Sequence, residues 1–334
     1  MQGVHCPRMV RCVALVVLLV SSGLLLGGAG PTQKRAQPFR IGALTTSWGP
    51  TPVIVALRDG LLALGYREGE QFELGVRFTQ GNLAELPAAA RELVQYGVDL
   101  IFADGEESGK AAQMATSQIP IVFFAGGSDL PRSGLIQSFA RPGGNITGVA
   151  NLRIELGPKR LQVFKDLIPA LQRVLLPYDA ADATTVAALQ EYRDAARRLG
   201  IELVEQAVRT EEEAQATLAA VRKGEIDGIL SQDTTTLNIG GFVLKATARQ
   251  AIPSMFPSVW WAEQGGLASY GPDLYDSGRQ VVRLVDKILK GAKPAELPVE
   301  VNNKIEFVIN LKTAQTLGLT IAPEVLFQAD RLIR

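Results

Sequence analysis

Apolar residues along this chain gather in short continuous runs that alternate with longer stretches of helical spacing. Between Pro52 and Leu64, apolar residues recur at the spacing of one helix face, which predicts an amphipathic helix. The runs that predict strands in the first half are 39–44, 72–78, 99–103 and 119–125, and further helices are predicted at 83–96 and 109–117. Near-continuous apolar strands separated by helices are typical of a parallel sheet covered on both faces.

The second half of the chain repeats this order at a spacing of about 130 residues, which indicates a duplicated domain. The helix predicted at 184–199 ends at Gly200, as the helix at 52–64 ends at Gly65. Glycine is favoured there because it adopts the left-handed backbone of a helix C-cap without steric cost. The predicted strands of this half are 173–177, 201–208, 227–231 and 251–256. We therefore expect an α/β protein with two doubly wound parallel-sheet lobes.

Residues 1–30 have the order of a secretory signal peptide: two arginines, a mostly apolar run at 13–26, and small residues at 27–30. We predict cleavage near Ala29 or Gly30 and export to the periplasm or another extracytoplasmic space. A retained membrane anchor is the alternative. No cysteine lies at the expected cleavage point, so we do not expect a lipid attachment there.

The same N-terminal segment holds the only histidine and both cysteines of the chain, His5, Cys6 and Cys12. The remaining sequence therefore excludes disulfides, thiolate nucleophiles, histidine-ligated zinc and a Ser-His-Asp relay. Its carboxylates show no acid–base pair recognisable by spacing and no calcium-loop pattern, so we expect no metal, no cofactor and no enzyme activity. The 34 basic and 34 acidic residues leave no basic excess for a nucleic-acid partner.

Candidate ligand contacts follow the predicted strands, because ligands of open parallel sheets bind beyond the carboxyl ends of the strands. In the first half these residues are Thr45, Thr46, Ser47, Asp104, Glu106, Gly126 and Gly127. The hydroxyls suit a carboxylate at a helix N-terminus, or they cap the next helix. The acids suit an amine or a sugar hydroxyl, or they complement the helix dipole. The glycine pair is expected to leave backbone N–H groups open to a cleft.

The second half offers a matching set after its own strands. The candidates are Tyr178, Asp179, Asp233, Phe256 and Tyr270. An acid and an aromatic ring at neighbouring strand ends suit a ligand with an amine and a flat or apolar part. The competing interpretation is that Phe256 belongs to the core and Asp233 caps a turn. If the strand ends of both lobes face one cleft, that cleft is the binding site.

Several segments resemble one family of ABC transporter substrate-binding proteins with a type I periplasmic-binding fold, which contains the tryptophan- and tyrosine-binding proteins. Residues 141–149, Arg-Pro-Gly-Gly-Asn-Ile-Thr-Gly-Val, are similar to its signature at the first crossing between lobes. The other similar segments are 64–69, 270–273, 285–294, 297–300, 307–314 and 317–320. The resemblance covers the whole predicted mature chain.

The resemblance implies a hinge between two lobes, and Pro142-Gly143-Gly144 has the backbone freedom that a hinge uses. By analogy with the fold, the chain returns to the first lobe near Asp273 and leaves it again near Leu297. We expect the first lobe to comprise residues 38–148 plus 272–296. The second lobe is expected to comprise residues 149–271 plus 297–334.

The resemblance also implies a function, the extracytoplasmic solute-binding component of an ABC uptake transporter. We expect a monomer whose partners are a small solute and the permease and ATPase subunits of the importer. An aromatic amino acid or similar zwitterion is the first expectation. Three loops depart from the family: 126–131 is one residue longer, Tyr178-Asp179 replaces Asn-Pro, and the acidic 104–107 replaces a neutral loop. The resemblance therefore supports a role in transport more strongly than it supports specificity for an amino acid.

Two other functions stay open on sequence alone. The first is a ligand sensor of the same fold that acts through a membrane receptor, because its sequence would look the same. The second is a secreted hydrolase that uses only carboxylates, for instance Asp104 and Asp233.

Overall fold

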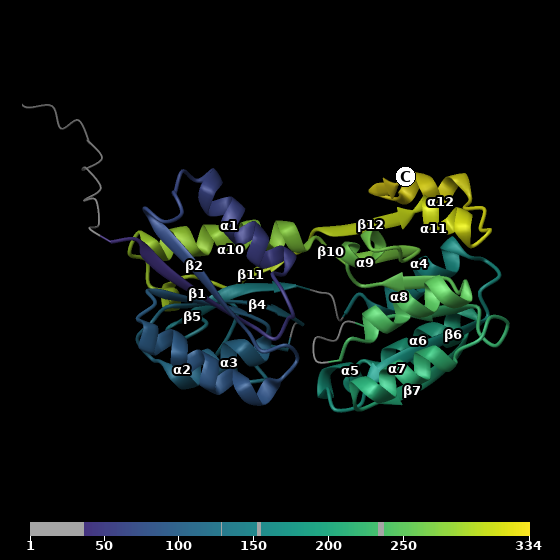
Figure 1. Cartoon of the computed structure of the whole chain (residues 1–334), viewed down its shortest axis with the longest axis horizontal. Helices are drawn as coiled ribbons and strands as arrows, with labels where there is room; N and C mark the ends of the chain where they lie inside the picture. The colour runs from purple at the N-terminus through teal and green to yellow at the C-terminus, as the bar shows by residue number, and fades with distance from the viewer. Residues whose placement is uncertain (1–36, 128, 152–154, 233–236) are drawn as a thin grey trace, which may run out of the picture. The chain divides into compact units, whose positions relative to one another are not determined.

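The computed structural model describes residues 37–334 except 128, 152–154 and 233–236 (Figure 1). The predicted signal peptide lies outside the described residues. The part from Gln37 to Arg334 forms one compact unit with two separate sheets. The first sheet has the strand order β11-β5-β4-β3-β1-β2, and the second has the order β13-β12-β10-β9-β8-β6-β7.

The first sheet pairs all its strands in parallel. Its strands are β1 (Phe39–Thr45), β2 (Phe72–Phe78), β3 (Leu100–Asp104), β4 (Ile121–Gly126), β5 (Ile146–Asn151) and β11 (Glu300–Asn302). Every residue of β5 is buried, and so is nearly every residue of β3 and β4. Continuous apolar runs predicted these strands because both faces of the sheet are covered.

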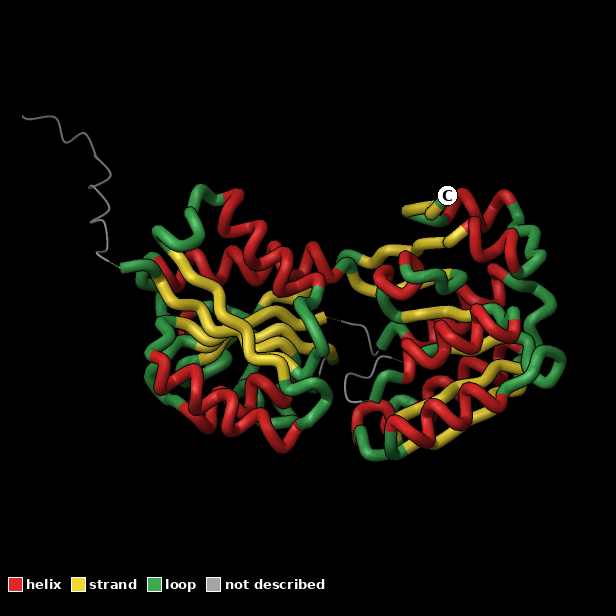
Figure 2. The backbone as a smooth tube through the Cα atoms, in the orientation of Figure 1, coloured by secondary structure: helices red, strands yellow, loops and turns green. Residues whose placement is uncertain are grey.

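Helices cover both faces of this sheet, as Figure 2 shows in red on either side of the yellow strands. The helices are α1 (Pro52–Ala63), α10 (Leu274–Leu289), α2 (Leu86–Tyr96) and α3 (Glu106–Ala115), and a 3₁₀ turn, η1 (Leu83–Glu85), precedes α2. Leu100 and Phe102 of β3 pack in the core under α1 and α10. Their neighbours Ile101 and Ala103 pack in the core under α2 and α3. Successive side chains of one strand therefore supply two cores.

Helices α1 and α10 approach closely at Gly278. A Cβ added there would lie 2.3 Å from Cβ of Ala56 and 3.0 Å from the carbonyl oxygen of Val53. Because α10 arrives from the far end of the sequence, this contact ties the returning chain to the first lobe.

Gly278→Ala is expected to lower the free energy of unfolding by about 2 kcal/mol, because the two helices must move apart to admit the methyl group. Urea unfolding of the variant and the wild type measures the difference. Gly75→Ala in β2 is the matched control, since a Cβ there meets nothing within 4 Å. Equal stability of the Gly278 variant and the control would contradict the close contact.

The second sheet repeats the first, with one antiparallel pair added, β10 with β12. Its strands are β6 (Arg173–Asp179), β7 (Glu202–Val208), β8 (Gly228–Leu230), β9 (Ser254–Phe256), β10 (Ala268–Pro272), β12 (Ile305–Asn310) and β13 (Arg331–Ile333). The order β7-β6-β8-β9-β10 matches β2-β1-β3-β4-β5 of the first sheet. The predicted duplication into two doubly wound lobes is thus confirmed.

Helices also cover both faces of the second sheet. They are α4 (Gly157–Leu167), α5 (Ala183–Ala187), α6 (Leu189–Leu199), α7 (Glu211–Ala220), α8 (Ile239–Gln250), α9 (Val259–Glu263), α11 (Leu311–Thr316) and α12 (Pro323–Gln328). The remaining 3₁₀ turn, η2 (Pro294–Glu296), precedes β11 of the first sheet. Val174 and Leu176 of β6 share a core with α4 and α6, whereas Leu175 between them packs with α7 and α8.

The ends of the first sheet differ from the lobe limits expected at 148 and 296. Residues 149–151 complete β5, and residues 300–302 form β11 beside it, so both segments belong to the first sheet. The hydroxyl of Thr147 donates to the carbonyl oxygen of Leu297 at 2.8 Å, which holds the approach to β11 against β5. The residues of β11 are Glu-Val-Asn, which form no apolar run, and for this reason the sequence did not indicate this strand.

Candidate functional site

A cavity of about 860 Å³ lies at the carboxyl ends of the strands and is lined by loops of both lobes. We call it the strand-end cavity. The first lobe lines it with Thr46, Gly81, Asn82, Leu83, Ala84, Gly105, Glu106, Glu107, Ser108, Lys110, Gly126 and Ser133. The second lobe lines it with Asp179, Ala181, Asp182, Ala183, Thr185, Arg209 and Leu237. This volume suits a small molecule.

The loop after β1 brings one of its three predicted hydroxyl residues to the cavity, Thr46. Thr45 is buried and its hydroxyl lies 3.3 Å from a carboxylate oxygen of Asp104, which also accepts a hydrogen bond from the hydroxyl of Thr51 at 2.8 Å. The hydroxyl of Ser47 donates to the carbonyl oxygen of Gly49 at 2.6 Å. Thr45, Ser47 and Asp104 therefore shape the loop, and Thr46 lines the cavity.

The N-terminus of α3 forms the middle of the first-lobe wall. Gly105 precedes it with φ of 111°, a conformation that favours glycine, and its N–H donates to the carbonyl oxygen of Phe124 at 2.8 Å. Lys110 binds the carboxylates of Glu106 at 2.7 Å and Glu107 at 3.0 Å. Burial lowers the pKa of Lys110, but the hydrogen bonds to these two glutamates outweigh burial and raise its pKa above the ordinary value. The ammonium group of Lys110 is thus charged and already paired.

Ser108, in the first turn of α3, lines the cavity with a hydroxyl that is buried and makes no hydrogen bond in the described part of the chain. Gly126, at the end of β4, also lines the cavity. The N–H of its neighbour Gly127 donates to the carbonyl oxygen of Asn151 at 2.9 Å. The expectation that both glycines leave N–H groups open is therefore wrong for Gly127, because the sheet uses its donor.

The second-lobe wall begins at Asp179, which ends β6 and is 3% exposed. One of its carboxylate oxygens accepts the N–H of Ala181 at 2.8 Å, and its carbonyl oxygen accepts the hydroxyl of Thr185 at 2.9 Å. These bonds turn the chain from β6 into α5 along the cavity. Tyr178 precedes Asp179 and packs against the core of the second lobe.

The two other predicted aromatic contacts also belong to that lobe's cores. Phe256 is fully buried and stacks on Trp261 with ring centroids 5.7 Å apart. Tyr270 packs edge-on against Phe307, and its carbonyl oxygen accepts a hydrogen bond from Nε of Arg160 at 2.8 Å. The competing interpretation, that Phe256 is a core residue, fits this position, because an apolar residue at a strand end can face either way. Asp233 lies outside the described residues.

Other lining residues were not among the predicted contacts. They include Asn82, Lys110, Ser133, Asp182, Thr185 and Arg209. Arg209 directly follows β7, so the strand-end rule applied to every strand would have found it. Within the described ranges, no three histidine, cysteine, aspartate or glutamate residues gather as a potential metal site. In that same part of the chain, no helix combines the length and apolar character that a membrane span requires.

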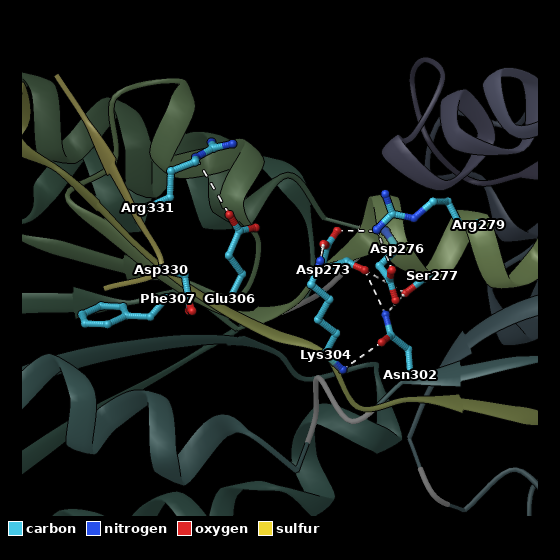
Figure 3. Close-up of polar contacts among 10 residues, drawn as sticks. All are labelled: Asp273, Asp276, Ser277, Arg279, Asn302, Lys304, Glu306, Phe307, Asp330 and Arg331. Carbon is cyan, nitrogen blue, oxygen red and sulfur yellow. Dashed lines mark hydrogen bonds and ion pairs between the residues drawn. The ribbon is translucent and has the colours of Figure 1, made fainter. Parts of the chain in front are cut away.

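Two of the segments that connect the lobes run side by side (Figure 3). One joins β10 to α10 at Asp273, and the other joins β11 to β12 at 303–304. Asp273 and Lys304 meet twice: the N–H of Asp273 donates to the carbonyl oxygen of Lys304 at 3.0 Å, and Nζ of Lys304 lies 2.9 Å from the Asp273 carboxylate. We call these two segments, with their contacts, the double crossing.

Asn302 joins the two segments of the double crossing from a fully buried position. Its side-chain amide donates to the carbonyl oxygen of Asp273 at 2.9 Å and to the hydroxyl of Ser277 at 2.6 Å. Its side-chain oxygen accepts the N–H of Lys304 at 2.9 Å. One side chain thus fixes the end of β11 against the start of α10 (Figure 3).

Ionisable side chains at and beside the double crossing have shifted pKa values. Burial would raise the pKa of Asp273, but the hydrogen bonds from Lys304 and from the N–H of Asp276 outweigh burial and lower it. The same hydrogen bond raises the pKa of Lys304. Burial is the main cause that raises the pKa of Glu306, and the nearby positive charge of Arg331 opposes it. The Asp273–Lys304 pair is therefore charged over the whole neutral range.

Asp273→Asn is expected to cost about 0.5–1 kcal/mol at neutral pH and less in acid. A carboxyl whose folded pKa is lowered stabilises the fold above its unfolded pKa, and this contribution disappears as pH falls through the folded pKa, which lies below the ordinary aspartate value. Asparagine keeps the N-cap of α10, so the variant isolates the charge. Unfolding of both proteins at a series of pH values measures the difference. The Glu306 contribution has the opposite sign, and it becomes smaller in the variant because the charge of Asp273 is one of the causes that raise the pKa of Glu306. A difference independent of pH would contradict the prediction.

Comparison with known proteins adds to this geometry. The model of a family described as ABC transporter substrate binding protein matches residues 53–333. A tyrosine-binding protein of Clostridioides difficile is 27% identical over 258 residues, which cover 76% of this chain and 73% of that protein.

Two solved structures resemble the chain closely in fold. A conserved domain protein of Vibrio cholerae superposes with a TM-score of 0.78 at 27% identity, covering 89% of this chain and 100% of that one. A Streptococcus pneumonia ABC domain in complex with L-Trp superposes with a TM-score of 0.77 at 25% identity, with the same two coverages. The resemblance found in the sequence is thereby confirmed. The chain belongs to the ABC transporter substrate-binding protein family, whose members bind substrates and are not enzymes.

Proposed function

We propose that this protein captures a small zwitterionic solute in the strand-end cavity and delivers it to the permease and ATPase subunits of an ABC importer. The observation that carries the proposal is the cavity itself, which is lined by strand-end residues of both lobes. The protein acts as an extracytoplasmic monomer after removal of residues 1–30. The first lobe extends to Asn151 and again from α10 to Asn302.

The solute is proposed to be an amino acid, with aromatic amino acids as the first candidates. The support is the relative named as a tyrosine-binding protein and the similar structure that holds L-Trp. A solute that touches both lobes binds the closed arrangement of the lobes more tightly than the open one. It therefore shifts the population towards closure by its difference in affinity.

Thermal unfolding with and without solutes tests capture. The protein is first unfolded and refolded by dialysis to remove any solute that co-purifies, and is then mixed with amino acids, nucleosides, sugars and small organic acids. A solute present at about 100 times its Kd adds about 2.7 kcal/mol to the free energy of unfolding and raises the Tm. Absence of a shift with every solute would contradict capture.

A further inference from the structure

Arg209 is a positive charge on the second-lobe wall of the strand-end cavity whose guanidinium has no hydrogen bond or ion pair within the described ranges. The other lysine or arginine that lines the cavity is Lys110, and two glutamates already bind it. Exposed arginines elsewhere in the second lobe are commonly paired, as Arg173 is with Glu202 and Arg193 with Glu205. Arg209 is thus the cavity cation that can bind an anionic group of a solute.

Backbone hydrogen bonds fix the position of Arg209 just before the N-terminus of α7. Its N–H donates to the carboxylate of Glu213 at 2.8 Å, and the hydroxyl of Thr210 accepts the N–H of Glu213 at 3.2 Å. This arrangement is similar to a capping box, except that the glutamate accepts the N–H of the residue before the N-cap, Thr210, and it fixes the entry of the chain into α7. Because Glu213 is engaged by the backbone, the side chain of Arg209 extends from a rigid base.

The remaining charges of the cavity are acidic. Glu106 and Glu107 share Lys110 on the first-lobe wall, and Asp179 and Asp182 line the second-lobe wall. Such a cavity favours a solute that carries an ammonium group, and a solute with an additional carboxylate needs a cation to receive it. Guanidinium binds carboxylate through two parallel hydrogen bonds, which adds orientation to charge.

We propose that Arg209 binds the carboxylate of the solute and so selects amino acids over the corresponding amines. The inference rests on the proposed function and deepens it. It assigns the recognition of the carboxylate to the second lobe, at the carboxyl end of β7. The side chain has room to adjust because it is exposed in this structure.

Calorimetric titration of Arg209→Ala with two matched pairs of solutes tests the inference. The pairs are L-tryptophan with tryptamine and L-tyrosine with tyramine, whose members differ by the carboxylate alone. Arg209→Ala is expected to weaken binding of the amino acids about 10-fold or more, because a charge-assisted bidentate contact is lost. It is expected to change amine binding by less than about twofold, since the amines lack the group that Arg209 contacts. Arg209→Lys keeps the positive charge but cannot form two parallel hydrogen bonds. Its affinity for the amino acids should therefore lie between the affinities of wild type and Arg209→Ala.

Arg198→Ala is the matched control, because Arg198 is an exposed arginine of the same lobe that does not line the cavity. Wild-type affinity of Arg209→Ala for the amino acids would overturn the inference, and so would an equal loss for amino acids and amines. In both cases the proposed function would stand. If wild type binds no amino acid while another solute raises its Tm, the proposal that the solute is an amino acid is wrong. The inference about Arg209 is then wrong as well. Unchanged Tm values of the ligand-free variants show that the substitutions leave the fold intact.

Discussion

Replacement of Asn302 by leucine is expected to lower the free energy of unfolding by about 3 kcal/mol, because buried hydrogen-bonding groups lose their partner. Leucine fills a similar volume but cannot donate to Asp273 and Ser277 or accept from Lys304, as the asparagine amide does. Ser277 still donates to the carbonyl oxygen of Asp273 at 3.1 Å, which limits the loss. The effect is large because this fully buried side chain makes hydrogen bonds to both segments of the double crossing.

Urea unfolding of Asn302→Leu measures this loss, and Asn303→Leu is the matched control. Asn303 is the next residue and is exposed, so the same exchange there should stay within about 0.5 kcal/mol of wild type. A loss at Asn302 no larger than the loss at Asn303 would show that the double crossing does not depend on this side chain.

Ala181→Trp is expected to weaken solute binding by about 100-fold or more, because the indole ring occupies space that the solute needs. Ala181 is exposed in the loop between β6 and α5 and lines the strand-end cavity. A methyl group at that position leaves the cavity open, whereas an indole ring projects into it. The substitution should leave the Tm of the ligand-free protein nearly unchanged, since surface substitutions usually alter stability by about 0.5 kcal/mol or less.

Ala187→Trp provides the comparison for that binding measurement. Ala187 is exposed at the end of α5 and does not line the cavity. Titration of both variants with the solute that stabilises wild type should show binding by the Ala187 variant and almost none by the Ala181 variant. Full binding by Ala181→Trp would mean that the solute site lies elsewhere.

The fold could be predicted from sequence to a large extent because the sheets are covered on both faces. Their central strands are continuous apolar runs, such as 119–125, and such runs stand out against amphipathic helices. The duplication was visible because both lobes repeat the same order. The edge strands β11 and β13 were not predicted, whereas β8 and β9, which also have three residues, lie within the predicted runs 227–231 and 251–256. β11 and β13 belong to no longer apolar run, and their pairing with β5 and β12 defines them as strands.

The site could be predicted only in part. The strand-end rule gave Thr46, Glu106, Gly126 and Asp179, which line the cavity. The rule says where a residue lies along a strand, but hydrogen bonds decide where its side chain points. Thr45 is an example, since its hydroxyl contacts Asp104 and the threonine is buried beside the cavity-lining Thr46.

The central claim is that a solute binds between the lobes and draws them together, and a distance measured across the cavity tests it most directly. Residues 37–334 contain no cysteine, so one engineered cysteine in each lobe can carry a spin label without competition. Met114 in α3 and Val186 in α5 are exposed and suit this purpose. Pulsed electron resonance on the Met114→Cys, Val186→Cys protein should show a shift towards shorter distances when the stabilising solute is added, and no shift when Ala181→Trp is also present. An unchanged distance distribution at saturating solute would contradict the account.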